Sequence, residues 1–190
     1  QMQTFGAKQI SNEIDELWPE LKTLSKDKLA KIHAYRSMLT TKRLKSADLS
    51  AGRALFEKSC VNCHKLFGYG GTTGPDLTGA QRSNLHYLLE NIVDPSATVS
   101  KNYHMTIFVL EDGRVLNGII MSQTERTITI QMPKQQIVIS RDEIDEMRNS
   151  ELSMMPDRQL EVLGPDDIRD LIGYLMSSHQ VPLPPNPDGR

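Results

Sequence analysis

The sequence predicts a mainly α-helical fold into which a small β-sheet or barrel is inserted before the last helix. Three observations support this fold class. Apolar residues recur at helical spacing in the first half of the chain and again after Pro165. A stretch rich in β-branched residues lies between these helical patterns. The 190 residues, 38% of them hydrophobic, are enough for one compact domain or two small ones.

Two helices are predicted near the start of the chain, within residues 5–43. The first is interrupted by Pro19, which lacks the N–H that a helix interior needs. The second is expected to begin at Ser25, whose hydroxyl can cap a helix N-terminus. We expect residues 1–46 to form an N-terminal helical segment or linker.

The next helix is predicted to begin near Asp48 or Ser50 and to run into Cys60. Residues 68–79 hold five glycines and one proline, so they are expected to form a loop with special backbone requirements. Ser83 is the expected cap of a short helix that follows this loop. That helix is expected to end at the Asp-Pro pair of residues 94–95, because the residue before a proline disfavours the helical conformation.

The β-branched stretch is predicted to form four or five short strands of a twisted sheet or barrel over residues 103–149. Asp112-Gly113 is the expected hairpin turn between two apolar runs. Ile128 and Ile130 alternate with threonines, as in a half-buried strand.

Helical periodicity returns at the end of the chain. Pro165 is expected at the first position of the last helix, with Asp166 and Asp167 in its first turn, where the helix dipole favours negative charge. The proline-rich tail of residues 179–190 is expected to be extended or disordered.

Charge and hydropathy exclude several classes of partner. The net charge is −2 with both signs interspersed, so we expect no nucleic-acid partner. No apolar run approaches the roughly 18 residues that a membrane-spanning helix needs, so membrane insertion is not expected. The chain begins with Gln1 and is expected to be a processed product or an excised piece; the missing signal therefore says nothing about its compartment.

Both cysteines lie in one pentapeptide, C-V-N-C-H, which contains Cys60, Cys63 and His64. A thioredoxin-like dithiol would require the pair at the start of a helix, whereas a helix is expected to precede it here. A zinc site requires four ligands, and the remaining histidines are scattered without ligand spacing. Covalent attachment of haem c uses both thiols and the histidine at once. We therefore favour haem c over the dithiol and the zinc site.

A c-type haem makes further demands that the sequence can meet. The axial imidazole of His64 needs a hydrogen bond to its other ring nitrogen, and the carbonyl of Pro75 in the G-P-D-L turn is well placed to accept it. The haem face needs an apolar wall, which Leu77, Leu85, Leu88 and the last helix are expected to supply.

The sixth ligand of the iron is expected in the segment "LSMMPDRQL", because a methionine thioether on an irregular segment is a common solution. We favour Met155 over Met154, since Pro156 restricts the backbone beside it. His104 and Met147 are less favoured alternatives.

The order of these motifs resembles a class I cytochrome c: a helix, C-x-x-C-H, G-P-D-L, M-P and a closing helix. A longer series of segments is similar to a narrower group, the haem-binding domains of large multidomain proteins of planctomycetes and verrucomicrobia. These segments are "GRALFEKSCVNCHKLFGYGGTTGPDL", "DGRVLNGII" and "SMMP" followed by "IRDLIGYLM". The resemblance implies Cys60 and Cys63 as thioether sites, His64 as the proximal ligand and a methionine of S-M-M-P as the distal ligand.

The resemblance also implies a division of the chain. Residues 47–102 and 150–178 would form the haem domain, and residues 103–149 would be a β-rich insertion. The insertion could cover the haem edge or act as a lid; alternatively, it could be a docking face for a redox partner.

We expect an electron carrier rather than an enzyme. A single covalent haem would exchange single electrons with a redox partner protein or with an upstream domain of the same polypeptide. One alternative is a haem enzyme or gas sensor in which the distal ligand is absent or labile and peroxide, CO or NO binds the iron; another is a protein-interaction module in which the haem is only a structural staple. Haem c is attached outside the bacterial cytoplasm, so the resemblance implies a periplasmic or exported protein.

Overall fold

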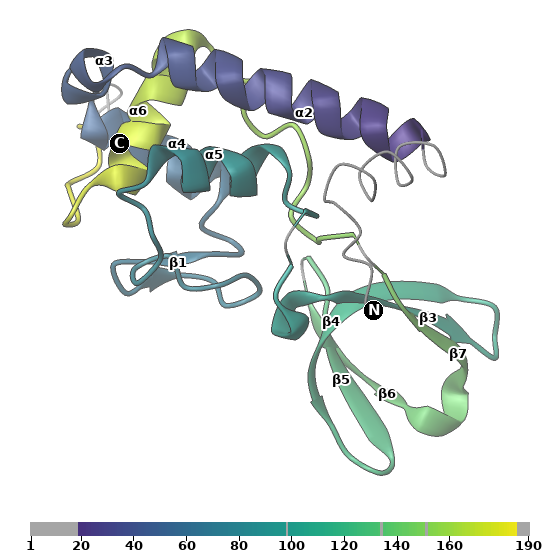
Figure 1. Ribbon diagram of the computed structural model, residues 1–190. Helices are drawn as coiled ribbons and strands as arrows, with labels where there is room; N and C mark the ends of the chain where they lie inside the picture. The colour runs from purple at the N-terminus through teal and green to yellow at the C-terminus, as the bar shows by residue number, and fades with distance from the viewer. Residues whose placement is uncertain (1–18, 98, 134, 151, 186–190) are drawn as a thin grey trace, which may run out of the picture.

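The structure, a computed structural model, describes residues 19–97, 99–133, 135–150 and 152–185. Figure 1 shows a group of helices at one end and a β sheet at the other. The helical part contains α2 (Pro19–Met38), α3 (Thr41–Lys45), α4 (Leu49–Ser59), α5 (Leu85–Val93) and α6 (Pro165–Met176). A two-stranded hairpin, β1 (Lys65–Leu66) and β2 (Tyr69–Gly70), lies between α4 and α5 in the chain.

The helical core is built on the close packing of α4 against α6. At Gly52, a Cβ atom would lie only 2.0 Å from the carbonyl oxygen of Asp170, so only glycine permits the two helices to approach this closely. The ring centres of Phe56 on α4 and Tyr174 on α6 are 5.7 Å apart, and both side chains are almost fully buried. Of the apolar stripe expected on α6, Ile168, Leu171, Ile172 and Leu175 are buried, and Met176 is partly buried.

The N-terminal helix differs from the prediction. Pro19 is the first residue of α2, a position at which a helix needs no N–H from the residue. Ser25 lies inside α2, so its prediction as an N-cap is wrong. The helix predicted before Pro19 lies outside the described residues. α2 packs on α5 and contributes Ile32 to the core.

The caps of α4 and α5 test two further predictions. Asp48 caps α4, because its carboxylate accepts the N–H groups of Ser50 and Ala51, each at 3.0 Å. For α5 the cap is Asn84, one residue after the predicted Ser83. Serine and asparagine are both good N-caps. The cap is Asn84 because its side-chain oxygen reaches the free N–H groups of His86 and Tyr87.

The β part is a single antiparallel sheet with the strand order β6-β5-β4-β3-β7, so the last strand returns to pair with the first. Its five strands are β3 (Met105–Leu110), β4 (Val115–Gln123), β5 (Thr127–Gln131), β6 (Gln136–Ser140) and β7 (Ile144–Asn149). The short 3-10 helices η1 (Lys101–Tyr103) and η2 (Arg141–Glu143) precede β3 and β7. The predicted turn at Asp112-Gly113 is confirmed, and Gly113 adopts a φ of 84° there.

The sheet has a hydrophobic core of its own, separate from that of the helices, formed by Phe108, Leu110, Ile128, Ile130 and Ile139. The predicted insertion of strands before the last helix is therefore present, but a fold with two cores of different classes is only partly described as mainly α. The division of the chain into domains at the stated boundaries stays a prediction. Within the described residues, no helix has the length and apolar character required to traverse a bilayer.

Candidate functional site

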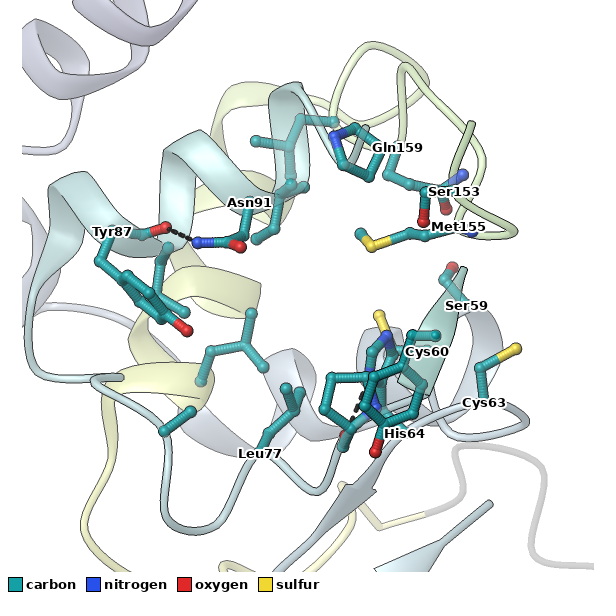
Figure 2. A pocket seen from close by; sticks show the side chains of 18 of the residues that line it. Ser59, Cys60, Cys63, His64, Leu77, Tyr87, Asn91, Ser153, Met155 and Gln159 are labelled. Atoms are coloured by element: carbon teal, nitrogen blue, oxygen red, sulfur yellow. Dashed lines mark hydrogen bonds between the residues drawn. The ribbon is translucent and has the colours of Figure 1, made fainter. Parts of the chain in front are cut away.

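A cavity of about 330 Å³ lies in the helical part, in the size range of small-molecule and cofactor sites. Its walls come from the end of α4, the loop after it, α5, α6 and the segment between β7 and α6 (Figure 2). Six residues predicted for the site line this one cavity: Cys60, Cys63, His64, Pro75, Leu77 and Met155. Leu88 also lines it as predicted, whereas Leu85, predicted for the apolar wall, does not. Residues 60 and 155 are far apart in the sequence, so the tertiary fold brings them together.

The C-x-x-C-H segment is a tight turn that continues from α4. Cys60 is the C-cap of the helix, and its carbonyl oxygen accepts the N–H groups of Cys63 at 3.1 Å and of His64 at 2.9 Å. In Figure 2 the Cys60 sulfur lies within the cavity, whereas the Cys63 sulfur points outward at its edge. The turn thus places two thiols and an imidazole along one side of the cavity.

Both thiols have raised pKa values in the protein chain. Burial raises the pKa of Cys60 to about 11, and the neighbouring Cys63 adds to the effect. Burial also raises the pKa of Cys63. A redox-active dithiol needs a thiolate stabilised by a helix N-terminus or a nearby cation, whereas this pair follows a helix C-terminus. The geometry therefore opposes the dithiol interpretation. In the described part of the chain, no group of three or more His, Cys, Asp or Glu side chains is arranged to hold a metal ion.

His64 is held by the hydrogen bond that the sequence led us to expect. Its Nδ1 lies 3.0 Å from the carbonyl oxygen of Pro75. A carbonyl oxygen can only accept, so Nδ1 carries the proton and the lone pair of the neutral ring is on Nε2. This tautomer is the one in which a histidine can bind a metal through Nε2.

The glycine-rich loop fits closely around the C-x-x-C-H turn. The N–H of Gly74 donates to the carbonyl of Cys63 at 2.7 Å, and the N–H of Gly71 donates to that of Val61 at 2.7 Å. A Cβ atom on Gly74 would lie 2.6 Å from Cε1 of His64, and one on Gly71 would lie 2.1 Å from the carbonyl oxygen of Asn62. The loop composition is thus explained by contact with the turn that carries the histidine.

Met155 faces the cavity from a different wall than His64. Figure 2 shows its sulfur pointing into the cavity from the segment before α6. Its N–H donates to Oγ of Ser153, whose own N–H donates to Oγ of Ser96, both at 3.1 Å. Of the four candidates for a sixth ligand, all within the described chain, Met155 alone lines the cavity; Met154, His104 and Met147 do not.

Sequence reasoning missed the polar part of the cavity wall, formed by Ser59, Tyr87, Asn91, Ser100, Tyr103, Ser153 and Gln159. Tyr87 and Asn91 lie one turn apart on α5, and the Asn91 amide donates to the Tyr87 carbonyl at 2.7 Å. Helical spacing could have placed both on the same face as Leu88. It could not have shown that this face borders a cavity.

The β sheet contributes none of the described residues that line the cavity, but the chain entering it does. Pro95, Val99, Ser100 and Tyr103 all lie before β3 and line the wall. The hydrogen bond between Ser96 and Ser153 joins the segments that enter and leave the sheet. The sheet is therefore attached at the rim of the cavity.

Arg82 binds the C-terminal end of α6. Its buried guanidinium donates to the carbonyls of Leu175 at 2.6 Å and Ser177 at 2.8 Å, which end α6, and lies 4.8 Å from the ring centre of Phe67. A cation at the C-terminus of a helix is favoured by the helix dipole. Since Leu175 also lines the cavity, Arg82 supports the cavity wall from outside.

Replacing Arg82 with methionine should destabilise the protein by about 2–3 kcal/mol, because one buried and one partly buried carbonyl group lose a charged donor. Denaturant unfolding followed by circular dichroism measures this change. Arg36→Met is the control, since Arg36 is exposed on α2, and it should alter stability by no more than about 0.5 kcal/mol. Equal stability of the two variants would contradict a supporting role for Arg82.

Residues 49–108 match the family model described as Cytochrome c. No curated protein matches the chain. The matched residues include α4, the C-x-x-C-H turn, the glycine-rich loop and α5, and they end before Met155. The match supports a c-type cytochrome with a haem-binding, electron-transferring role. The narrower resemblance to domains of planctomycetes and verrucomicrobia stays a prediction.

Proposed function

We propose that this cytochrome c-like chain is an electron-transfer module that holds one haem c in the cavity. Cys60 and Cys63 would form the thioether bonds, and His64 and Met155 would be the axial ligands. The observation that carries the proposal is the meeting of all four side chains on one cavity, with His64 held in the tautomer that leaves Nε2 available. These residues come from two segments that the chain brings together only by folding.

The residues present fit the group. The donor set pairs a neutral imidazole with a soft thioether, a combination typical of electron-transferring c-type haems. The two thiols lie along the same side as the imidazole, where covalent attachment would occur. Much of the remaining wall is apolar, from Leu77, Leu88, Ile92, Leu160, Leu171 and Leu175. Gly74 leaves the space that the imidazole ring needs.

When bound, the haem supplies a one-electron couple between ferric and ferrous iron. The chain determines how readily that couple is reduced. The Pro75 carbonyl orients His64 and makes it more electron-donating. Met155 and the apolar walls act in the opposite direction, because a thioether and a water-poor environment favour the ferrous state. We infer a comparatively high potential, suited to accepting electrons from a donor.

We further propose that the donor or acceptor is a separate redox protein or an upstream domain of the same polypeptide. A periplasmic or exported location would follow from covalent haem attachment. The attachment of the β sheet beside the cavity is compatible with a docking face near the haem edge and also with a cover for that edge.

Absorption spectroscopy of the purified holoprotein tests the proposal. The haem should stay attached in acidified organic solvent, and the spectrum should be six-coordinate and low-spin in both oxidation states. A reversible voltammetric wave and slow or absent CO binding should accompany it. A five-coordinate resting protein that binds CO readily would instead indicate a haem enzyme or gas sensor, and the absence of a wave would indicate a structural haem.

A further inference from the structure

The helix α2 lies outside the residues that match the cytochrome c family, yet it contacts the segment that carries Met155. We call residues 152–164, between β7 and α6, the Met155 loop. Figure 1 shows this yellow-green segment passing beneath α2 on its way to α6. The loop contains no helix or strand, so its position depends on side-chain contacts with its neighbours.

Two lysines of α2 form ion pairs across this contact. Lys28 Nζ lies 2.6 Å from Oδ1 of Asp94, at the end of α5, and 3.5 Å from Oδ2 of Asp157 in the Met155 loop. Lys31 Nζ lies 2.5 Å from Oε1 of Glu161, also in the loop. Lys28 therefore joins three elements, and Lys31 adds a second connection one turn further along α2.

Each ion pair has at least one partner that is partly shielded from water. The side chains of Lys28 and Asp94 expose 21% and 26% of their surface and that of Glu161 exposes 25%, whereas those of Asp157 and Lys31 expose 49% and 44%. Partly buried pairs are screened less by salt than exposed ones. Arg158 also pairs with Glu161 at 2.8 Å, so the carboxylate is held from both the loop and α2.

Apolar packing links the same contact to the cavity. Ile32 of α2 and Leu160 of the loop are both buried in the helical core, exposing 4% and 2%. Leu160 and its neighbour Gln159 also line the cavity that contains Met155. A displacement of α2 would therefore release a loop whose side chains form the cavity wall beside Met155.

We propose that α2 is a clamp that holds the Met155 loop against the cavity, with Lys28 and Lys31 as positioning residues for Met155. The proposal rests on the role of Met155 put forward above. Loop opening would withdraw the thioether and admit small ligands to that side of the cavity. The clamp therefore sets how often the site opens, while the C-x-x-C-H turn on the opposite wall stays in place.

The test compares hydrogen exchange in the 190-residue holoprotein and its Lys28→Met/Lys31→Met variant. Backbone amides of the Met155 loop should exchange about three- to tenfold faster in the variant, because both ion pairs between α2 and the loop are lost. The exchange rates of backbone amides in α6, the next element in the chain, should be unchanged. The double variant Lys28→Arg/Lys31→Arg should restore slow exchange, because it restores the charges. Lys26→Met is the matched control, since Lys26 is exposed on the same helix and outside these ion pairs.

A second readout separates the clamp from the proposed ligation. Imidazole should bind the oxidised Lys28→Met/Lys31→Met variant faster than the wild-type protein, by a similar factor. On heating, this variant should lose its sulfur-to-iron charge-transfer absorption at a lower temperature than its helices unfold. If the wild-type protein lacks that absorption but loop exchange still responds, the ligation by Met155 fails and the clamp stands. The clamp is wrong if the loop amides of Lys28→Met/Lys31→Met exchange at the same rate as those of Lys26→Met. It is also wrong if exchange in α6 becomes faster by the same factor as exchange in the loop.

Discussion

Replacing Met155 with alanine should abolish the sulfur-to-iron charge-transfer absorption of the oxidised holoprotein. Only Met155 of the two adjacent methionines lines the cavity, so its removal takes away the one thioether that shares the cavity with His64 among the described residues. The reduction potential should fall, because a thioether stabilises the ferrous state. The vacated position should then bind CO in the ferrous protein and imidazole in the ferric protein. Optical spectroscopy and voltammetry of the same sample measure all three effects.

Met154→Ala is the control for this change. It removes a side chain of the same type from the adjacent position, which does not line the cavity, so the absorption and the potential should both be retained. Loss of the band in the position-154 variant together with its retention in the position-155 variant would reverse the assignment. Loss in neither variant would point to a ligand from elsewhere in the chain.

Replacing Gly74 with alanine should disturb the opposite side of the site. The added Cβ would lie 2.6 Å from Cε1 and 2.8 Å from Nδ1 of His64, so the ring or the loop must move. Either movement breaks the hydrogen bond between Nδ1 and the Pro75 carbonyl. We expect a loss of stability of about 1–3 kcal/mol from overpacking, and a mixed or high-spin spectrum of the oxidised protein. The haem should stay attached, because neither cysteine is affected.

Gly79→Ala provides the matched comparison in the same loop. A Cβ at Gly79 meets nothing within 4 Å, and its backbone φ needs no glycine, so the change in stability should stay within about 0.5 kcal/mol. Thermal unfolding and the spin-state spectrum would be recorded for both variants. An unaltered spectrum in Gly74→Ala would mean that this glycine does not limit the position of the imidazole.

Features that depend on neighbouring residues could be predicted from the sequence. The C-x-x-C-H turn is defined by hydrogen bonds across three and four residues, and the bond from His64 to Pro75 spans only 11. The start of α6 at Pro165 and the hairpin at Asp112-Gly113 likewise depend on local backbone preferences. Local rules were less reliable where two residues offered the same cap, as at Ser83 and Asn84.

Contacts between segments that are distant in the sequence could not be predicted from local patterns. Ser25 has the right chemistry for a cap, but α2 continues through it from Pro19 and packs on α5. Tyr87 and Asn91 look like ordinary positions beside an apolar helix face until the cavity is seen. The strands of the β part alternate as expected, yet only the pairing of β7 with β3 shows how the sheet returns to the rim of the cavity.

The chemistry of the candidate site can therefore be predicted from short motifs, because each of its reactive groups belongs to a recognisable local pattern. Tertiary structure alone decides that Met155 and not Met154 lines the cavity with His64, and which contacts hold it there. Lys28 and Asp94 are separated by 66 residues, and Lys31 and Glu161 by 130. Such pairs form only when burial of the helical core has brought α2 and the Met155 loop together, and no local pattern in either segment carries that information.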